Sequence, residues 1–258
     1  MLTEVHVPED VPAAVSLIAA GATIIGGGTA LMPSLNDYGS PPTELVSLRR
    51  TGLSGVHLDG STVTIGATTT LAQLEHDPRL EILNPVVRSI ASVPVRTLAT
   101  VGGNLFVPQP HGDLAVALVA LNARAVLAGA GPAELPLTEP ALVTAVTFEL
   151  PEPGSFRYLK AARRRYNSAS LVTVAATIAE SGGIVTGARV ALGGVGNRVL
   201  RAHAVEQALI GRPLTAATVH DAAQEGLDEL SPADDAYASA WYRRRVFPVH
   251  LRRALLGH

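Results

Sequence analysis

The sequence has no cysteine among its 258 residues. The chain by itself therefore holds no disulfide, no thiol nucleophile and no cysteine-bound zinc or iron–sulfur cluster. Charge is also scarce: charged residues make up 16% of the chain, and the formal net charge is −2. This composition gives no reason to expect a nucleic acid or an anionic membrane as a partner.

Long apolar runs are missing as well. Hydrophobic residues make up 47% of the chain, but no uninterrupted run approaches the ~18–20 residues that a membrane span requires. Glu4, Glu9 and Asp10 precede the first apolar stretch without any Lys or Arg, which is unlike a secretory signal. We therefore expect a soluble, cytoplasmic protein with no membrane span and a core divided over one or two domains.

The common hydrolytic motifs are absent too. The sequence has no Gly-x-Ser-x-Gly elbow and no His-Glu-x-x-His pair, and its histidines are scattered without ligand spacing. These absences argue against a hydrolase, and we predict no metal site.

Two glycine-rich stretches stand out against this background. "IIGGGTAL", residues 24–31, follows a predicted strand at 22–25, and "TVGGN", residues 100–104, repeats the design. Glycine-rich backbone can approach an anion closely and direct its N–H groups at phosphate oxygens. Leu31 stands where a dinucleotide fingerprint needs its third glycine, and no Walker loop is present. A tight turn explains either stretch alone, whereas two such stretches favour a ligand.

The remaining pattern alternates helices and strands. A hairpin is predicted at 55–67 with its turn at Asp59-Gly60, and a helix at 83–99 ending near Pro94. Gly and Pro cluster at 128–153, which predicts a domain boundary. Further segments are predicted as helices at 8–21, 69–80, 201–215 and 234–257, as a helix running into a strand at 112–129, and as strands at 43–50, 155–164, 170–180 and 183–196.

"IIGGGTALMP" and "TLATVGGNL", together with "ARVALGGVGNRVL" and "SAWYRRRVFPVHLRRAL", resemble the FAD-binding medium subunit of the molybdenum hydroxylases. This group includes enzymes of the xanthine dehydrogenase, carbon monoxide dehydrogenase and aldehyde oxidase type. The resemblance implies an α+β fold with a PCMH-type FAD-binding domain at 1–152, made of two α/β subdomains at about 1–54 and 55–152. A C-terminal α+β domain at 153–258 would follow, with a small antiparallel sheet and helices.

The resemblance also implies a set of FAD-binding residues. The first loop would cradle the pyrophosphate, the second would face it, Asp113 would lie near the flavin and ribityl chain, and Lys160 beside the isoalloxazine. From the sequence alone, Asp113 is equally an N-cap and Lys160 a strand-edge side chain in water. The implied residues are Ile24, Ile25, Gly26, Gly27, Gly28, Thr29, Ala30, Leu31, Thr100, Gly102, Gly103, Asn104, Asp113 and Lys160.

The function implied by the resemblance is electron transfer, so no residue of this chain would be catalytic in the usual sense. Because this chain has no cysteine, the [2Fe–2S] clusters that feed its FAD would belong to a small iron–sulfur subunit, and the molybdopterin to a large subunit. Electrons would then leave for an external acceptor, and the complex would be a dimer of heterotrimers. Two arginine runs, 163–165 and 243–245, are candidate contacts with a partner subunit.

Two departures from the family pattern keep alternatives open. Thr29-Ala30 stands where many members have His or Asp–Ser, which removes a side-chain hydrogen bond to the phosphates, and the 128–153 segment is short. These departures motivate a degenerate structural subunit that binds FAD weakly or not at all. A self-contained flavin oxidase is a second alternative, but the sequence offers no clear general base for it.

Overall fold

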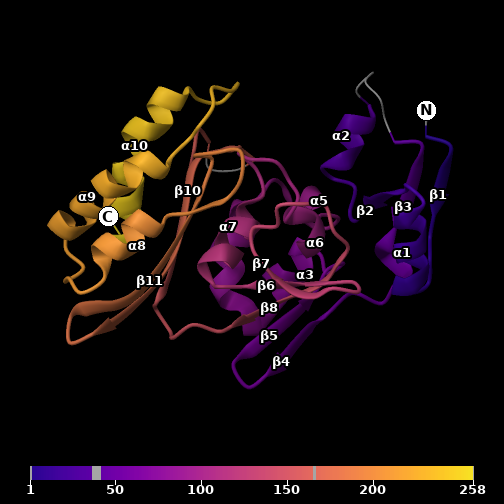
Figure 1. Ribbon diagram of the computed structural model, residues 1–258, viewed down its shortest axis with the longest axis horizontal. Coiled ribbons are helices and arrows are strands. Elements are labelled where there is room, and N and C mark those ends of the chain that lie inside the picture. Colours follow the sequence, from indigo (N-terminus) through magenta and orange to yellow (C-terminus); the bar gives the residue numbers. More distant parts are fainter. Residues whose placement is uncertain (1, 37–41, 165–166, 258) are drawn as a thin grey trace.

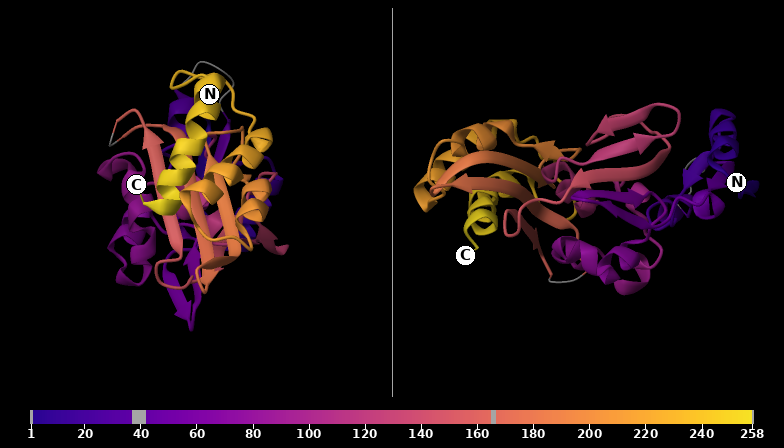
Figure 2. Two further views of the ribbon diagram at one scale, coloured as in Figure 1. Left: turned by 90° about the vertical axis from the view of Figure 1, so that its left-hand side faces the viewer. Right: turned by 90° about the horizontal axis from the view of Figure 1, so that it is seen from below.

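A computed structural model describes residues 2–36, 42–164 and 167–257. Three sheets follow one another along the long axis of the molecule, with the N-terminal sheet at one end and the C-terminal helices at the other (Figures 1 and 2). The fold class predicted from the sequence, α+β with a C-terminal antiparallel sheet and helices, is confirmed.

The N-terminal sheet is parallel and has the order β1-β3-β2. The strands β1 and β2 run in the same direction on either side of β3, so no tight hairpin can join them, and helix α1 makes the connection. The predicted cap of this helix is confirmed, because Asp10 Oδ1 accepts a hydrogen bond from the Ala13 N–H at 2.8 Å. The elements are β1 (Glu4–His6), α1 (Val11–Ala19), β2 (Thr23–Ile25), α2 (Leu31–Leu35), β3 (Glu44–Ser47) and η1 (Leu48–Arg50).

The middle sheet is antiparallel, with the order β4-β5-β8-β6-β7. The predicted hairpin is confirmed: Asp59 pairs with Thr62, and Gly60 in the turn has a φ of 59°. Side chains of this sheet and of the helices beside it form the largest core cluster. The strands are β4 (Val56–Asp59), β5 (Thr62–Gly66), β6 (Arg124–Leu127), β7 (Gly131–Glu134) and β8 (Val143–Glu149).

Two predictions for the helices beside this sheet are wrong. The expected single helix at 83–99 is broken, because Ala91 has a φ of 46° and Pro94 lies in the first turn of a new helix. The second glycine stretch, expected to be a loop, forms one helical turn. The helices are α3 (Leu71–His76), η2 (Pro78–Leu83), α4 (Asn84–Ser89), α5 (Val93–Arg96), α6 (Val101–Asn104) and α7 (Asp113–Ala120).

The C-terminal part has an antiparallel sheet in the order β12-β11-β10-β9, covered by helices. The last helix begins at Ala240, after Ser239 as its N-cap, and not at 234 as predicted. The elements are β9 (Phe156–Ala162), β10 (Ser170–Ser181), β11 (Ile184–Gly193), β12 (Leu200–Arg201), α8 (His203–Leu209), α9 (Ala216–Glu225), η3 (Gly226–Glu229) and α10 (Ala240–Leu256).

The arginine runs do not form one exposed surface. Arg243 is 2% exposed, pairs with Asp235 at 2.8 Å and donates to the Leu171 carbonyl, so it is not available to a partner as predicted. The other run lies partly outside the described residues, since Arg165 is not among them. Among the described residues, no helix combines the length and hydrophobicity needed to cross a bilayer.

Candidate functional site

The two glycine stretches touch each other. The first follows the carboxyl end of β2, and the second forms α6. A Cβ added to Gly27 would lie 1.6 Å from the Leu98 carbonyl oxygen, and one added to Gly26 would lie 2.6 Å from Thr100 Oγ1. Contact between the two stretches therefore requires glycine at both positions, whether or not a ligand is bound.

Gly28 has a different reason to be glycine. Its φ is 73°, in the left-handed region that glycine adopts without strain. Its carbonyl accepts a hydrogen bond from the Met32 N–H at 2.8 Å, at the start of α2. The turn interpretation therefore accounts for Gly28, and the contact between the stretches accounts for Gly26 and Gly27.

The second stretch is held by Thr100. Its side chain accepts a hydrogen bond from the Gly103 N–H at 3.2 Å, which makes it the N-cap of α6. Its backbone forms a bridge with Thr70. A Cβ on Gly102 would lie 2.9 Å from the Ala67 Cβ, so this turn packs closely against the end of β5.

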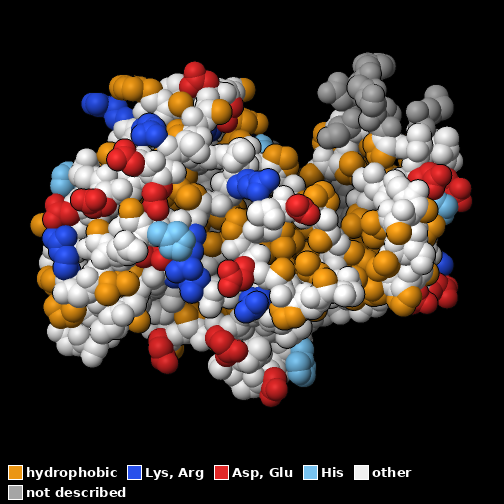
Figure 3. Space-filling view, in the orientation of Figure 1, with side chains coloured by type: hydrophobic (Ala, Val, Ile, Leu, Met, Phe, Trp, Pro, Cys, Tyr) orange, Lys and Arg blue, Asp and Glu red, His pale blue; other side chains and the backbone are white. Residues whose placement is uncertain are grey.

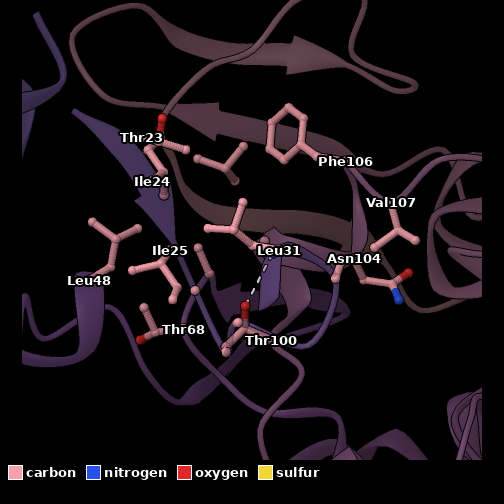
Figure 4. Close-up of a pocket in the computed structure, with 18 of the residues that line it drawn as sticks. Thr23, Ile24, Ile25, Leu31, Leu48, Thr68, Thr100, Asn104, Phe106 and Val107 are labelled. Carbon is pink, nitrogen blue, oxygen red and sulfur yellow. Dashed lines mark hydrogen bonds between the residues drawn. The ribbon is translucent and has the colours of Figure 1, made fainter. Parts of the chain in front are cut away.

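A cleft of about 730 Å³ lies between these stretches (Figure 4). It is lined by every predicted residue of the first stretch, Ile24 to Leu31, and by Thr100, Gly102, Gly103 and Asn104 of the second. Hydrophobic side chains gather between the N-terminal sheet and the middle of the molecule (Figure 3). The other lining residues are Ile18, Ala22, Thr23, Leu48, Ala67, Thr68, Ala99, Phe106, Val107, Pro108, Pro140, Ala141, Leu142 and Val143.

The described lining of the cleft has no charged side chain, but it includes polar ones. None of the described residues that line it is acidic, basic or histidine. Asn104 is 6% exposed, and its buried side-chain oxygen has no hydrogen-bond partner among the described residues. A buried acceptor left unpaired costs about 1–3 kcal/mol, so such atoms usually have a partner. A cofactor that places a donor at Asn104 and a phosphate at the glycine backbone fits this site.

Asp113 and Lys160 lie outside the residues that line the cleft. The Lys160 Nζ is 2.8 Å from Asp113 Oδ2 and donates to the Ser89 carbonyl at 3.0 Å. The hydroxyls of Ser170 and Thr173 both donate to Asp113 Oδ1 at 2.6 Å. This buried cluster joins α7 to β9 and β10.

This arrangement shows that Asp113 is not an N-cap and that Lys160 is not a strand-edge side chain in water. Lys160 is not in water, because its side chain is only 8% exposed. Asp113 is the first residue of α7 and not its N-cap, which is Gly112. Beside them, burial raises the pKa of Tyr158 well above its usual range, and its hydroxyl is 2.8 Å from that of Ser89. A contact of Asp113 or Lys160 with flavin remains a prediction.

Comparison with known proteins identifies the family. Residues 2–147 match the family described as "FAD binding domain in molybdopterin dehydrogenase", and residues 157–257 match "CO dehydrogenase flavoprotein C-terminal domain". The chain belongs to the FAD-binding subunits of the molybdenum-dependent dehydrogenases. It is thus an oxidoreductase subunit, and the resemblance noted in the sequence is confirmed.

Several relatives span nearly the same length. The glyceraldehyde dehydrogenase medium chain of Sulfolobus acidocaldarius is 29% identical over 89% of this chain and 88% of its own. The carbon monoxide dehydrogenase medium chain of Afipia carboxidovorans is 28% identical over 97% and 94%. The carbon monoxide dehydrogenase structure from Hydrogenophaga pseudoflava superposes with a TM-score of 0.92 at 27% identity, covering 99% of this chain and 96% of that one.

The motifs of this family do not reveal the whole cleft. Phe106, Val107, Leu48 and Leu142 line it, but the sequence analysis did not single them out. Apolar residues at these positions look like core residues in a sequence, because only the fold shows which of them face a cavity. Among the described residues, no three His, Asp or Glu side chains are grouped as a metal site requires.

Proposed function

We propose that this chain binds FAD in the cleft between the two glycine stretches and passes electrons from partner-held [2Fe–2S] clusters to an external acceptor. The observation that carries the proposal is the uncharged cleft, which combines closely apposed glycine backbone with the unpaired acceptor of Asn104. When bound, FAD supplies the ability to take up electrons singly or in pairs and to release them.

The residues of this chain then have distinct tasks. Backbone N–H groups at Gly26–Gly28 hold the pyrophosphate without a cationic side chain. The N–H groups of Gly102 and Gly103 already donate to the Ala67 carbonyl and to Thr100, so this part of the second stretch lines the cleft and offers no free donor. Asn104 accepts a hydrogen bond from a donor group of the cofactor. The apolar lining, such as Ile24 and Leu142, covers the faces of its rings and excludes water.

The partners follow from the absence of cysteine. A chain without thiolate ligands needs a separate iron–sulfur subunit as electron donor. We propose a small iron–sulfur subunit and a large molybdopterin subunit, arranged as a dimer of heterotrimers. Carbon monoxide dehydrogenase relatives whose matching chain is called a medium chain support a complex of several subunits.

The first test is the absorption spectrum of the chain, co-expressed with its genomic neighbours, before and after acid release of the cofactor. We expect the bands of oxidised flavin and about one FAD per chain. Thr29 lines the cleft and is not deeply buried, so Thr29→Glu places a negative charge beside the phosphates without disturbing the core. Thr29→Glu should lose FAD, whereas the neutral control Thr29→Gln should keep it. Equal FAD content in both variants would contradict the proposed site.

Electron transfer needs a second test on the assembled complex. Substrate should bleach the flavin bands of the complex, but not those of the isolated chain, which holds no cluster. Bleaching of the isolated chain by substrate would instead indicate a self-contained flavin oxidase.

One observation favours the structural-subunit alternative. The close approach of Gly26 and Gly27 to Thr100 and Leu98 explains these glycines without any ligand. A colourless, folded chain that still assembles with its partners would show that this alternative is correct.

A further inference from the structure

We infer that Phe106 is the ring-stacking residue of the cleft, and that its phenyl ring packs against one flat heteroaromatic ring of the bound dinucleotide. The inference rests on the proposed function, because it assumes that FAD binds in the cleft. It assigns to Phe106 the recognition of one ring of the cofactor. FAD contains two such rings, adenine and isoalloxazine, and the test below distinguishes them.

The backbone places Phe106 at the exit of the second glycine stretch. Its N–H donates to the Gly103 carbonyl at 3.2 Å, in continuation of α6. Its ring extends over the cleft toward the side formed by Thr23 and Ile24 (Figure 4). The same short segment therefore supplies both the glycine backbone and the aromatic ring.

The protein itself does not bury this ring. The chain has four phenylalanines, and the other three, Phe148, Phe156 and Phe247, pack in or against the hydrophobic core clusters. Phe106 belongs to none of these clusters and is 42% exposed. It is also the only aromatic side chain among the described residues that line the cleft.

The cleft that Phe106 lines also has an aliphatic lining, to which Ile24 and Leu142 belong. A planar ring between these side chains and Phe106 would be covered on both faces. Aromatic side chains stack on such rings in offset geometry, and stacking of this kind contributes to the binding of nucleobases. No charged side chain of the described lining competes for the ring, so stacking and apolar contact dominate its recognition.

The test uses the purified full-length chain freed of flavin and three probes: FAD, FMN and ADP. FMN carries isoalloxazine without adenine, and ADP carries adenine without isoalloxazine. Phe106→Leu removes the ring but keeps an apolar side chain, and Phe106→Tyr keeps the ring. Tyr242→Leu is the matched control, because Tyr242 is 41% exposed and lies on α10, outside the cleft lining.

We expect Phe106→Leu to weaken FAD binding about tenfold, consistent with stacking energies, and Phe106→Tyr and Tyr242→Leu to change it by less than about twofold. A parallel loss for ADP assigns Phe106 to adenine, and a parallel loss for FMN assigns it to isoalloxazine. Either result supports the inference. Thermal melting of the flavin-free variants should be unchanged, since the ring packs in no core.

Two results would overturn the inference. Unchanged FAD affinity in Phe106→Leu, with the wild-type chain binding normally, would reject the stacking role and leave the proposed function intact. An equal loss in Tyr242→Leu would show that the effect is not specific to the cleft. Failure of the wild-type chain to bind any of the three probes would reject the proposed function, and the inference with it.

Discussion

At the scale of single residues, Asn104 is the cleft residue whose role depends most on a ligand. Its buried oxygen has no hydrogen-bond partner in the part of the chain that the structure describes, so Asn104→Ala removes no hydrogen bond seen there through that atom. We expect FAD affinity to fall about two- to tenfold, the range of one hydrogen bond worth about 0.5–1.5 kcal/mol. The melting temperature of the flavin-free chain should change little. Titration and thermal melting measure both quantities, and a large loss of stability with unchanged affinity would show that Asn104 is structural.

The absence of charge in the cleft leads to a second prediction at this scale. Sites that hold phosphates with exposed Lys or Arg lose affinity as salt screens the charges. Here the described lining offers only backbone and uncharged side chains. We expect the FAD dissociation constant to change by less than about threefold between 50 and 500 mM NaCl. A steep loss of affinity with salt would indicate a cationic side chain at the phosphates.

At the scale of elements, the second glycine stretch depends on its cap. Thr100 is 7% exposed, caps α6 through the Gly103 N–H and lies directly against Gly26. Thr100→Val keeps the shape but removes the acceptor, so we expect a loss of about 1 kcal/mol of stability and weaker FAD binding. Thr100→Ser keeps the acceptor and serves as the control. If urea denaturation and FAD titration give the same values for both variants, the cap has no part in shaping the cleft.

At the scale of helices and strands, local sequence patterns were sufficient to predict some elements and insufficient for others. The Asp10 cap, the Asp59-Gly60 turn and the strands predicted at 155–164, 170–180 and 183–196 depend on short stretches of sequence, and these predictions are confirmed. The helix predicted at 83–99 is wrong because the chain leaves helical geometry at Ala91, before Pro94, and a new helix begins at Val93. The helical turn at Thr100–Asn104 was missed because its two glycines suggested a loop.

At the scale of the whole molecule, the Asp113–Lys160 pair connects the middle of the chain to its C-terminal sheet. Asp113→Asn leaves a buried lysine without its counter-charge, and breaking such a pair costs about 3–5 kcal/mol. Adding Lys160→Met removes the unpaired charge, while the amide oxygen introduced by Asp113→Asn can still accept from the hydroxyls of Ser170 and Thr173. The double variant should therefore recover most of the stability lost.

Urea denaturation of the flavin-free wild-type chain, the two single variants and the double variant measures this coupling. Additive losses in the double variant would show that the pair contributes no coupling. A change in FAD affinity in Lys160→Met, without a change in stability, would support the flavin contact that the family resemblance implies.

The sequence by itself determined the family, the α+β class and both glycine stretches, because these depend on residue order over short distances and on glycine's lack of a side chain. Only the tertiary structure decided that Gly27 lies against Leu98, that Lys160 pairs with an aspartate 47 positions away, and that Phe106 faces a cleft while the other phenylalanines are packed. The physical reason is that burial and ion pairing are properties of distances in space. The sequence alone does not show whether an apolar or charged residue faces the core, a cleft or water.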